Sequence, residues 1–381
     1  FDVGYTDGMK SLLAIALAGA AMTPCLWDSD TLDTELRGLP EAFDLIVGKW
    51  HRHSDAYYED RVAKLTVKSP VDLADYDDLA VAYEHLGKRD AAIETMARKA
   101  EALVAKPDKE HQYRYHANLG TFYAHAGKFD DALRELRAAV DINPDAHFGR
   151  EVFQIELIRY VAAANQDPSV WTLHSCLRHA GYYLSFSVGS NAISSDPVTY
   201  RERPGWNGNR KIDWDAAYKA LGGMLRFGGL EGAELYRALG ELYLAKEHLN
   251  LAWWAYGRAI ERGHPAAENL AGIRKSIESH WNEARPHNNT GHVNPTQADY
   301  DKKRAEADAW LARFQKAEAE AIGRGEDVRS DAGLKALLDL ANGVAPLKKT
   351  DPGTNWRFVT LMSCMGLFVL LFVLRAQAGK G

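Results

Sequence analysis

The sequence predicts an all-α protein, a solenoid of helical hairpins that ends in a single transmembrane helix. Three observations support this prediction. Three stretches of the 381-residue chain repeat one spacing of small, apolar and aromatic residues, and the stretches between them include Gly-, Pro- and Asn-rich linkers. An uncharged apolar run lies near the last residue. Recurring stretches of this kind are typical of solenoids, in which each hairpin buries its apolar face against the next.

The composition is that of a globular protein and excludes several functions. The chain is 46% hydrophobic and 26% charged, with a formal charge of −6, and it is long enough to bury more than one domain's core. The absence of a long basic stretch argues against nucleic acid as a partner. The three cysteines, Cys25, Cys176 and Cys364, have neither zinc-site nor disulfide-framework spacing, and only a Cys25–Cys176 bridge stays open.

Residues 1–24 are predicted to be a signal peptide with an upstream extension. Met9 and Lys10 form a short positive start, the stretch from Ser11 to Ala21 is apolar but too short to span a bilayer, and small residues such as Ala18 offer cleavage sites. An N-terminal amphipathic or core helix is the alternative. A signal peptide would place the rest of the chain outside the cytoplasm. Residues 25–70 are then expected to form an N-terminal helical segment.

Residues 71–166 are predicted to hold two helical hairpins and one further helix. Both hairpins have small or apolar residues at matching places and a glycine, Gly87 or Gly127, at the turn. Lys99 departs from the pattern because a small residue is usual there. In residues 113–144 the pattern is Leu119, Gly120, Tyr123, Gly127, Phe129, Ala132, Leu136, Ala139 and Pro144. It resembles the tetratricopeptide repeat (TPR), whose antiparallel helices cross at small residues.

The second half is predicted to contain an insertion and a third repeat. Residues 167–212 are expected to form a helix and a long loop, which covers residues 186–212 and is rich in Gly, Pro, Ser and Asn. Residues 213–282 are expected to form a helix and the third TPR, in which Glu247 replaces the turn glycine. In this repeat the pattern is Leu239, Gly240, Tyr243, Ala252, Tyr256 and Ala259.

The remaining segments are a linker, a charged helix and the apolar run. Residues 283–298 are the linker, and residues 299–345 form a charged helical segment that either lies along the array or extends as a stalk. Residues 346–381 are predicted to hold the transmembrane helix and a short cytoplasmic tail. The run from Phe358 to Leu374 carries no charge and at 1.5 Å per residue spans roughly 25 Å. A buried core helix is the alternative.

The region from about residue 25 to residue 165 resembles a group of uncharacterised secreted bacterial TPR proteins of planctomycete type. The stretches that support this resemblance include "CLWDSDTL", "YYEDRVAKL" and "YHANLGTFYAHAG". The resemblance implies export and the repeat fold, and it implies no enzyme activity. Together with the two ends, it predicts a location in the cell envelope, anchored in the inner membrane, with the body in the periplasm or otherwise outside the cytoplasm.

The TPR resemblance also implies a binding site. In that family the first helix of each repeat lines a concave groove that holds peptide. Helical spacing places one set of side chains on that face in each repeat. The set is mixed in charge and lacks the cluster of Lys and Arg residues that clamps a C-terminal carboxylate. Side chains that merely solvate the face are the alternative. The predicted groove residues are Asp77, Val81, Glu84, His85, Arg114, Ala117, Thr121, His125, Glu234, Arg237, Glu241 and Leu244.

No pattern in the sequence predicts catalysis, a cofactor or a metal. The 14 histidines form neither HExxH nor CxxCH, and Walker and GxSxG motifs are absent. We therefore expect a membrane-anchored, extracytoplasmic scaffold, not an enzyme, that binds protein or peptide partners, including those of a membrane complex. One alternative is an accessory enzyme or metal-binding subunit with a site near loop 186–212. Another is a self-assembling structural envelope protein, with Trp253 and Trp254 exposed at a subunit contact.

Overall fold

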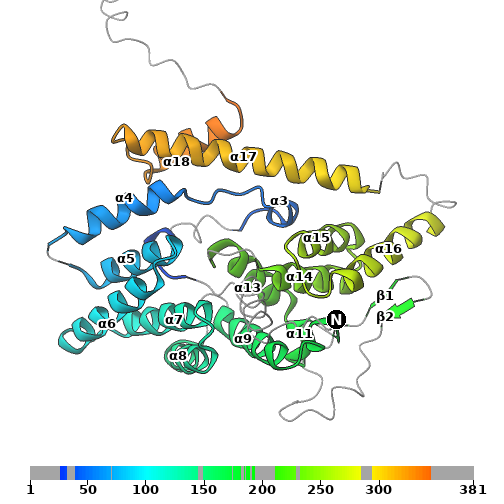
Figure 1. The fold of residues 1–381 in the computed structure, drawn as a ribbon, viewed down its shortest axis with the longest axis horizontal. Helices are drawn as coiled ribbons and strands as arrows, with labels where there is room; N and C mark the ends of the chain where they lie inside the picture. The colour runs from blue at the N-terminus through cyan, green and yellow to red at the C-terminus, as the bar shows by residue number, and fades with distance from the viewer. Residues whose placement is uncertain are drawn as a thin grey trace, which may run out of the picture.

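The structure is a computed structural model, and over the residues it describes it is an array of antiparallel helix pairs (Figure 1). The strands in these residues are one short antiparallel pair. The described residues are 26–31, 39–69, 71–144, 149–173, 175–181, 184, 186–188, 191–193, 211–228, 232–284 and 294–344.

The first half of the array contains two complete helix pairs. In order, its helices are α4 (Asp55–Thr66), α5 (Leu73–His85), α6 (Arg89–Ala105), α7 (Lys109–His125), α8 (Phe129–Ile142) and α9 (Arg150–Gln166). The side chain of Asp108 accepts the His111 N–H, which caps α7. Gly87 and Gly127 have φ values of 70° and 71°, so each supplies the left-handed residue that turns one helix into its partner.

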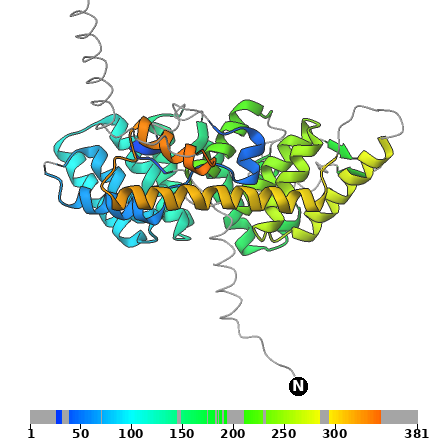
Figure 2. The same ribbon diagram turned by 90° about the horizontal axis from the view of Figure 1, so that it is seen from above.

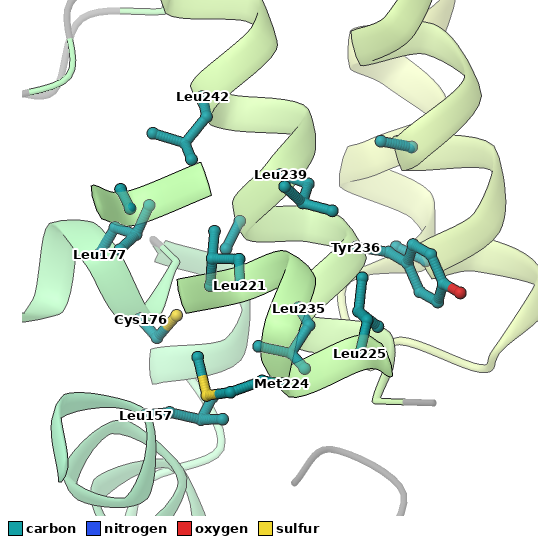
Figure 3. Close-up of a cluster of buried hydrophobic side chains, with 14 of the residues drawn as sticks. Leu157, Cys176, Leu177, Leu221, Met224, Leu225, Leu235, Tyr236, Leu239 and Leu242 are labelled. Carbon is teal, nitrogen blue, oxygen red and sulfur yellow. The ribbon is translucent and has the colours of Figure 1, made fainter. Parts of the chain in front are cut away.

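The second half contains α13 (Trp214–Phe227), α14 (Ala233–Ala245), α15 (Leu249–Glu261) and α16 (Ala267–Ala284). Helices α14 and α15 form the third pair, and Glu247 adopts the left-handed conformation at their turn, with φ of 62°. Helix α13 packs on α9 and joins the two halves. Buried side chains from α9, α11, α13 and α14 meet in one cluster, where Leu157, Cys176, Met224 and Leu235 lie close together (Figure 3).

Small residues allow the paired helices to approach closely, as the sequence predicts. A Cβ atom on Gly120 would lie 2.8 Å from Cγ of Leu136, and one on Gly240 would lie 2.7 Å from the ring of Tyr256. Both distances are shorter than side chains tolerate. Glycine is therefore required where α7 crosses α8 and where α14 crosses α15.

Where the structure describes it, the insertion between the halves forms short elements. It contains α10 (Val170–Leu173), α11 (Cys176–His179) and the strands β1 (Phe186–Val188) and β2 (Asn191–Ile193), which pair antiparallel with Phe186 opposite Ile193. Helix α11 packs against α9 and α14. Most of the predicted loop 186–212 lies outside the described residues.

A long helix links the two ends of the array. Helix α17 (Gln297–Gly323) runs back from the α16 end toward α4, with α18 (Asp331–Ala341) packed on it and α3 (Ala42–Val47) beneath it (Figures 1 and 2). Arg304 forms an ion pair with Glu261 at the end of α15 (2.9 Å), and Glu318 binds His53 before α4 (2.6 Å). Of the two arrangements left open by the sequence, the charged helix therefore lies along the array.

The predicted fold class needs one correction, which concerns the transmembrane helix. Among the described helices, none combines the length and apolar character that crossing a bilayer requires. Helix α17 is long enough, but it carries charged residues throughout, and a hydrocarbon core excludes these. The run from Phe358 to Leu374 lies outside the described residues, as do residues 1–24. The fold class that the structure supports is an all-α array without the membrane helix.

Candidate functional site

The inner face of the first two repeats holds a segment of the chain that precedes them. The Trp27 N–H donates to Oδ1 of Asn118 on α7 (2.7 Å), and Nδ2 of Asn118 donates to the Trp27 carbonyl (2.8 Å). The Trp27 ring is 1% exposed and packs edge-on against Tyr113, with ring centroids 6.0 Å apart. One side-chain amide thus satisfies both main-chain groups of a non-helical residue.

Three carboxylates beside Trp27 share one guanidinium. Arg61 on α4 binds Asp28 (3.0 Å), Asp78 on α5 (2.7 Å) and also Asp30. Burial, together with the neighbouring Asp30, raises the pKa of Asp28 to about 6. Burial also opposes ionisation of Asp30, but Arg61, His53, Tyr57 and Arg329 together outweigh it and hold the pKa of Asp30 below its usual range. The cluster therefore has an excess of negative charge that Arg61 alone does not neutralise.

In the second half, the inner face of α14 holds the insertion. Glu234 accepts the Cys176 N–H (2.6 Å) and lies 2.8 Å from His264 Nε2. Glu241 accepts the Ser175 hydroxyl, and Arg237 donates to the carbonyl of Trp171. The structure thus brings Glu234, Arg237 and Glu241 together around one segment of the chain.

The predicted groove residues of the first two repeats also have partners within the chain. Asp77 is buried and accepts from Lys99 Nζ (2.6 Å), which explains the unusual lysine in this repeat. Glu84 is paired with both Arg89 (2.9 Å) and His125 (2.7 Å), so residues of two repeats meet there. Their assignment to a peptide-binding groove stays a prediction. In the structure these side chains bind other residues of the same chain.

The remaining members of the predicted groove lie in three environments. Val81 and Leu244 are buried in the core, and Ala117 packs with Trp27 and Tyr113. The other three bond or stack with neighbours: Arg114 donates to Glu110 (3.0 Å), Thr121 accepts from Gln154 Nε2 (3.1 Å), and the His85 ring stacks on Tyr58 at 4.1 Å.

A cavity of about 250 Å³ lies where the N-terminal segment, α4, α5, α13 and α17 meet. Arg226 on α13 donates to the His51 carbonyl, and its Nη2 lies 2.9 Å from His51 Nε2. Burial and the neighbouring Arg52 lower the pKa of Arg226 to about 9. The lining residues are Asp28, Asp30, Thr31, Trp50, His51, Arg52, His53, Asp55, Tyr58, His85, Leu225, Arg226, Phe227 and Gln315.

The sequence did not identify Trp27, Asn118, Arg61 or Arg226 as site residues. Asn118 lies one helical turn from Arg114, on the predicted stripe, and "CLWDSDTL" stood out only as part of a resemblance. These residues come from four separate segments, and no local spacing connects them. The fold alone brings them together.

The structure bears on two of the alternative functions. Within the described residues no three His, Cys, Asp or Glu side chains are placed to hold a metal ion, and most of loop 186–212 lies outside those residues. Trp253 and Trp254, expected at a subunit contact, are 1% and 6% exposed and belong to the core. Cys176 is buried and free, and its predicted partner Cys25 lies outside the described residues.

Comparison with known families matches one of the predicted repeats. Residues 113–146, which contain most of α7 and all of α8, match the tetratricopeptide repeat. A search of curated proteins finds none that matches the chain, and the wider resemblance to secreted planctomycete-type proteins has no support from these comparisons. The matched repeat and the antiparallel helix pairs together support a tetratricopeptide-repeat protein.

Proposed function

We propose that the chain is a protein-interaction scaffold whose inner face recognises non-helical peptide segments. The observation that supports this most directly is the clamp that Asn118 forms on both main-chain groups of Trp27. TPR repeats generally mediate binding of protein partners. The proposal assigns no catalytic step to the chain.

Affinity and selectivity come from different contacts at this site. The two hydrogen bonds of Asn118 reach the main chain, so they would hold any residue in that place. Selectivity comes from the side chains around them. Tyr113 and Arg150 surround the indole, with the guanidinium 5.7 Å from the ring, and Arg61 binds the carboxylate of the next residue, Asp28. The preferred segment is therefore a tryptophan followed by an acidic residue.

The chain's own segment competes with any partner for this face. A tethered segment acts at an effective concentration of the order of millimolar, so an external peptide of equal intrinsic affinity binds poorly until the tethered one is displaced. Replacing Trp27 by alanine removes the side chain that fills the site between Tyr113 and Arg150. The Trp27→Ala variant should therefore be open to a peptide supplied in trans.

The test uses the full chain and a fluorescent peptide with the sequence of residues 26–31. We expect Trp27→Ala to bind this peptide at least about tenfold more tightly than the unaltered chain, measured by fluorescence anisotropy. A peptide with alanine in place of tryptophan is the ligand control, and the double variant Trp27→Ala, Asn118→Leu is the protein control. Failure of the folded Trp27→Ala variant to bind at about 1 mM peptide would refute the proposal.

An extracytoplasmic location is a second part of the proposal. It is supported by the positive start at Met9 and Lys10 and by the apolar stretch that follows. N-terminal sequencing of the protein isolated from its host tests it. A mature chain that begins near residue 25 supports export, and a chain that retains the apolar stretch contradicts cleavage and export by this route.

A further inference from the structure

One wall of the cavity beneath the N-terminal segment is positively charged. Within the described part of the chain, Arg226 forms no ion pair, and its Nε is buried without a hydrogen-bond acceptor. The guanidinium lies 4.9 Å from the Trp50 ring, and Arg52 adds a second positive charge beside it. A buried guanidinium is costly unless a carboxylate or another oxyanion accepts its N–H groups.

Another part of the lining is negatively charged. Asp28 and Asp30 both line the cavity, and together with Asp78 they share Arg61. Arg329, half exposed, adds one further contact to Asp30 at 3.2 Å. The carboxylates of Asp28, Asp30 and Asp78 outnumber the guanidiniums of Arg61 and Arg329 by one negative charge. A ligand ammonium group beside Asp28 and Asp30 would neutralise it.

The remaining wall is apolar, and the space is small. Trp50, Tyr58, Leu225 and Phe227 line it. A cavity of about 250 Å³ holds roughly eight waters at about 30 Å³ each, which corresponds to a ligand of about ten non-hydrogen atoms. The cavity thus combines an anion site, a cation site and an apolar surface within the length of one small molecule.

We propose that this cavity binds a free amino acid with an apolar side chain, with the carboxylate at Arg226 and the ammonium at Asp28 and Asp30. A simple carboxylate would satisfy Arg226 but would be repelled by the acidic wall. A simple amine would meet the reverse conflict. Only a zwitterion matches both walls, so it should bind more tightly than either of its halves. The site shares Asp28 and Asp30 with the docked segment described above, but its test on the unaltered chain requires no peptide partner.

The experiment titrates the full chain with L-leucine, L-valine, L-methionine and L-phenylalanine by isothermal calorimetry. 4-Methylpentanoate and 3-methylbutylamine, which are leucine without its ammonium and without its carboxylate, are the half-ligands. We expect at least one amino acid to bind, and both half-ligands of leucine to bind at least about tenfold more weakly than leucine. Half-ligand binding equal to that of leucine, or no binding by any of the four amino acids, overturns the proposal.

Variants locate the site. Arg226→Gln should weaken amino-acid binding by at least about tenfold, because it removes the carboxylate partner. Arg274→Gln is the matched control, since Arg274 on α16 is also an arginine stacked on a tryptophan, 3.7 Å from the Trp253 ring, but does not line the cavity. Unchanged binding by a folded Arg226→Gln variant overturns the assignment. Should that variant not fold, the half-ligand comparison on the unaltered chain still decides.

Discussion

Replacing Gly240 by alanine should destabilise the protein, whereas the same replacement at Gly272 should stabilise it. Both glycines lie inside helices, Gly240 in α14 and Gly272 in α16. Their surroundings differ. A Cβ at Gly240 would lie 2.7, 2.8 and 3.0 Å from three ring atoms of Tyr256, and a Cβ at Gly272 would meet nothing within 4 Å.

The magnitude follows from two opposing contributions to the free energy of unfolding. Alanine is favoured over glycine inside a helix by about 0.8–1.0 kcal/mol, which is the whole effect expected at Gly272. At Gly240 the added methyl group must displace Tyr256, a fully buried ring, and overpacking of this kind costs about 1–3 kcal/mol. The two variants should therefore differ by about 1–3 kcal/mol, and Gly240→Ala should be the less stable of the two.

Urea denaturation followed by far-UV circular dichroism measures this difference. With a common slope, the shift in midpoint converts directly into a difference in unfolding free energy. Adding Tyr256→Leu to Gly240→Ala should recover part of the loss, since it removes the ring that the methyl group meets. If Gly240→Ala stabilises the protein as much as Gly272→Ala does, helices α14 and α15 do not cross at this glycine and the inferred packing of the third repeat is wrong.

Three further predictions concern the turns, the cavity and the inner face. Glu247→Gly should stabilise the protein by about 1 kcal/mol and Gly127→Ala should destabilise it similarly, because both positions are left-handed; unchanged urea midpoints would contradict this. Burial lowers the pKa of His85 to about 3. On acidification the unfolded chain therefore binds a proton at His85 before the folded chain does. The free energy of unfolding should fall by roughly 1.4 kcal/mol per pH unit from about pH 6.5 down to about pH 3. His85→Phe should flatten that dependence in urea midpoints taken at several pH values, and an unaltered slope would argue against it. Lys99→Met should cost about 3–5 kcal/mol because it leaves the buried Asp77 without its cation, and adding Asp77→Leu should restore much of this loss in the same assay.

The helix pairs could be predicted because their signals are local. Gly120, Ala132 and Leu136 lie within one repeat, and their spacing alone indicates two helices that cross closely. The turn of the third repeat was less regular, because Glu247 occupies the glycine position. The rest of that repeat's pattern was sufficient to indicate the pair, and the backbone at Glu247 adopts the glycine-like conformation.

The occupants of the inner face could not be predicted, because their contacts join distant parts of the chain. Trp27 and Asn118 are 91 residues apart, and His53 and Glu318 are 265 apart. Helical spacing identifies which side chains point inward, but it does not identify what they meet. For the same reason the sequence left open whether helix α17 follows the array or leaves it.

The mixed charge of the inner face has a structural explanation in these long-range contacts. Buried ion pairs add little net stability, since their desolvation offsets their attraction, but an unpaired buried charge is strongly destabilising. Glu234, Arg237 and Glu241 are therefore stable beside a segment that presents matching donors and acceptors, as Trp171, Ser175 and Cys176 do. The same reasoning applies to Asp77 and Glu84 in the first half. Each half of the array thus holds one segment of the chain among its charged side chains.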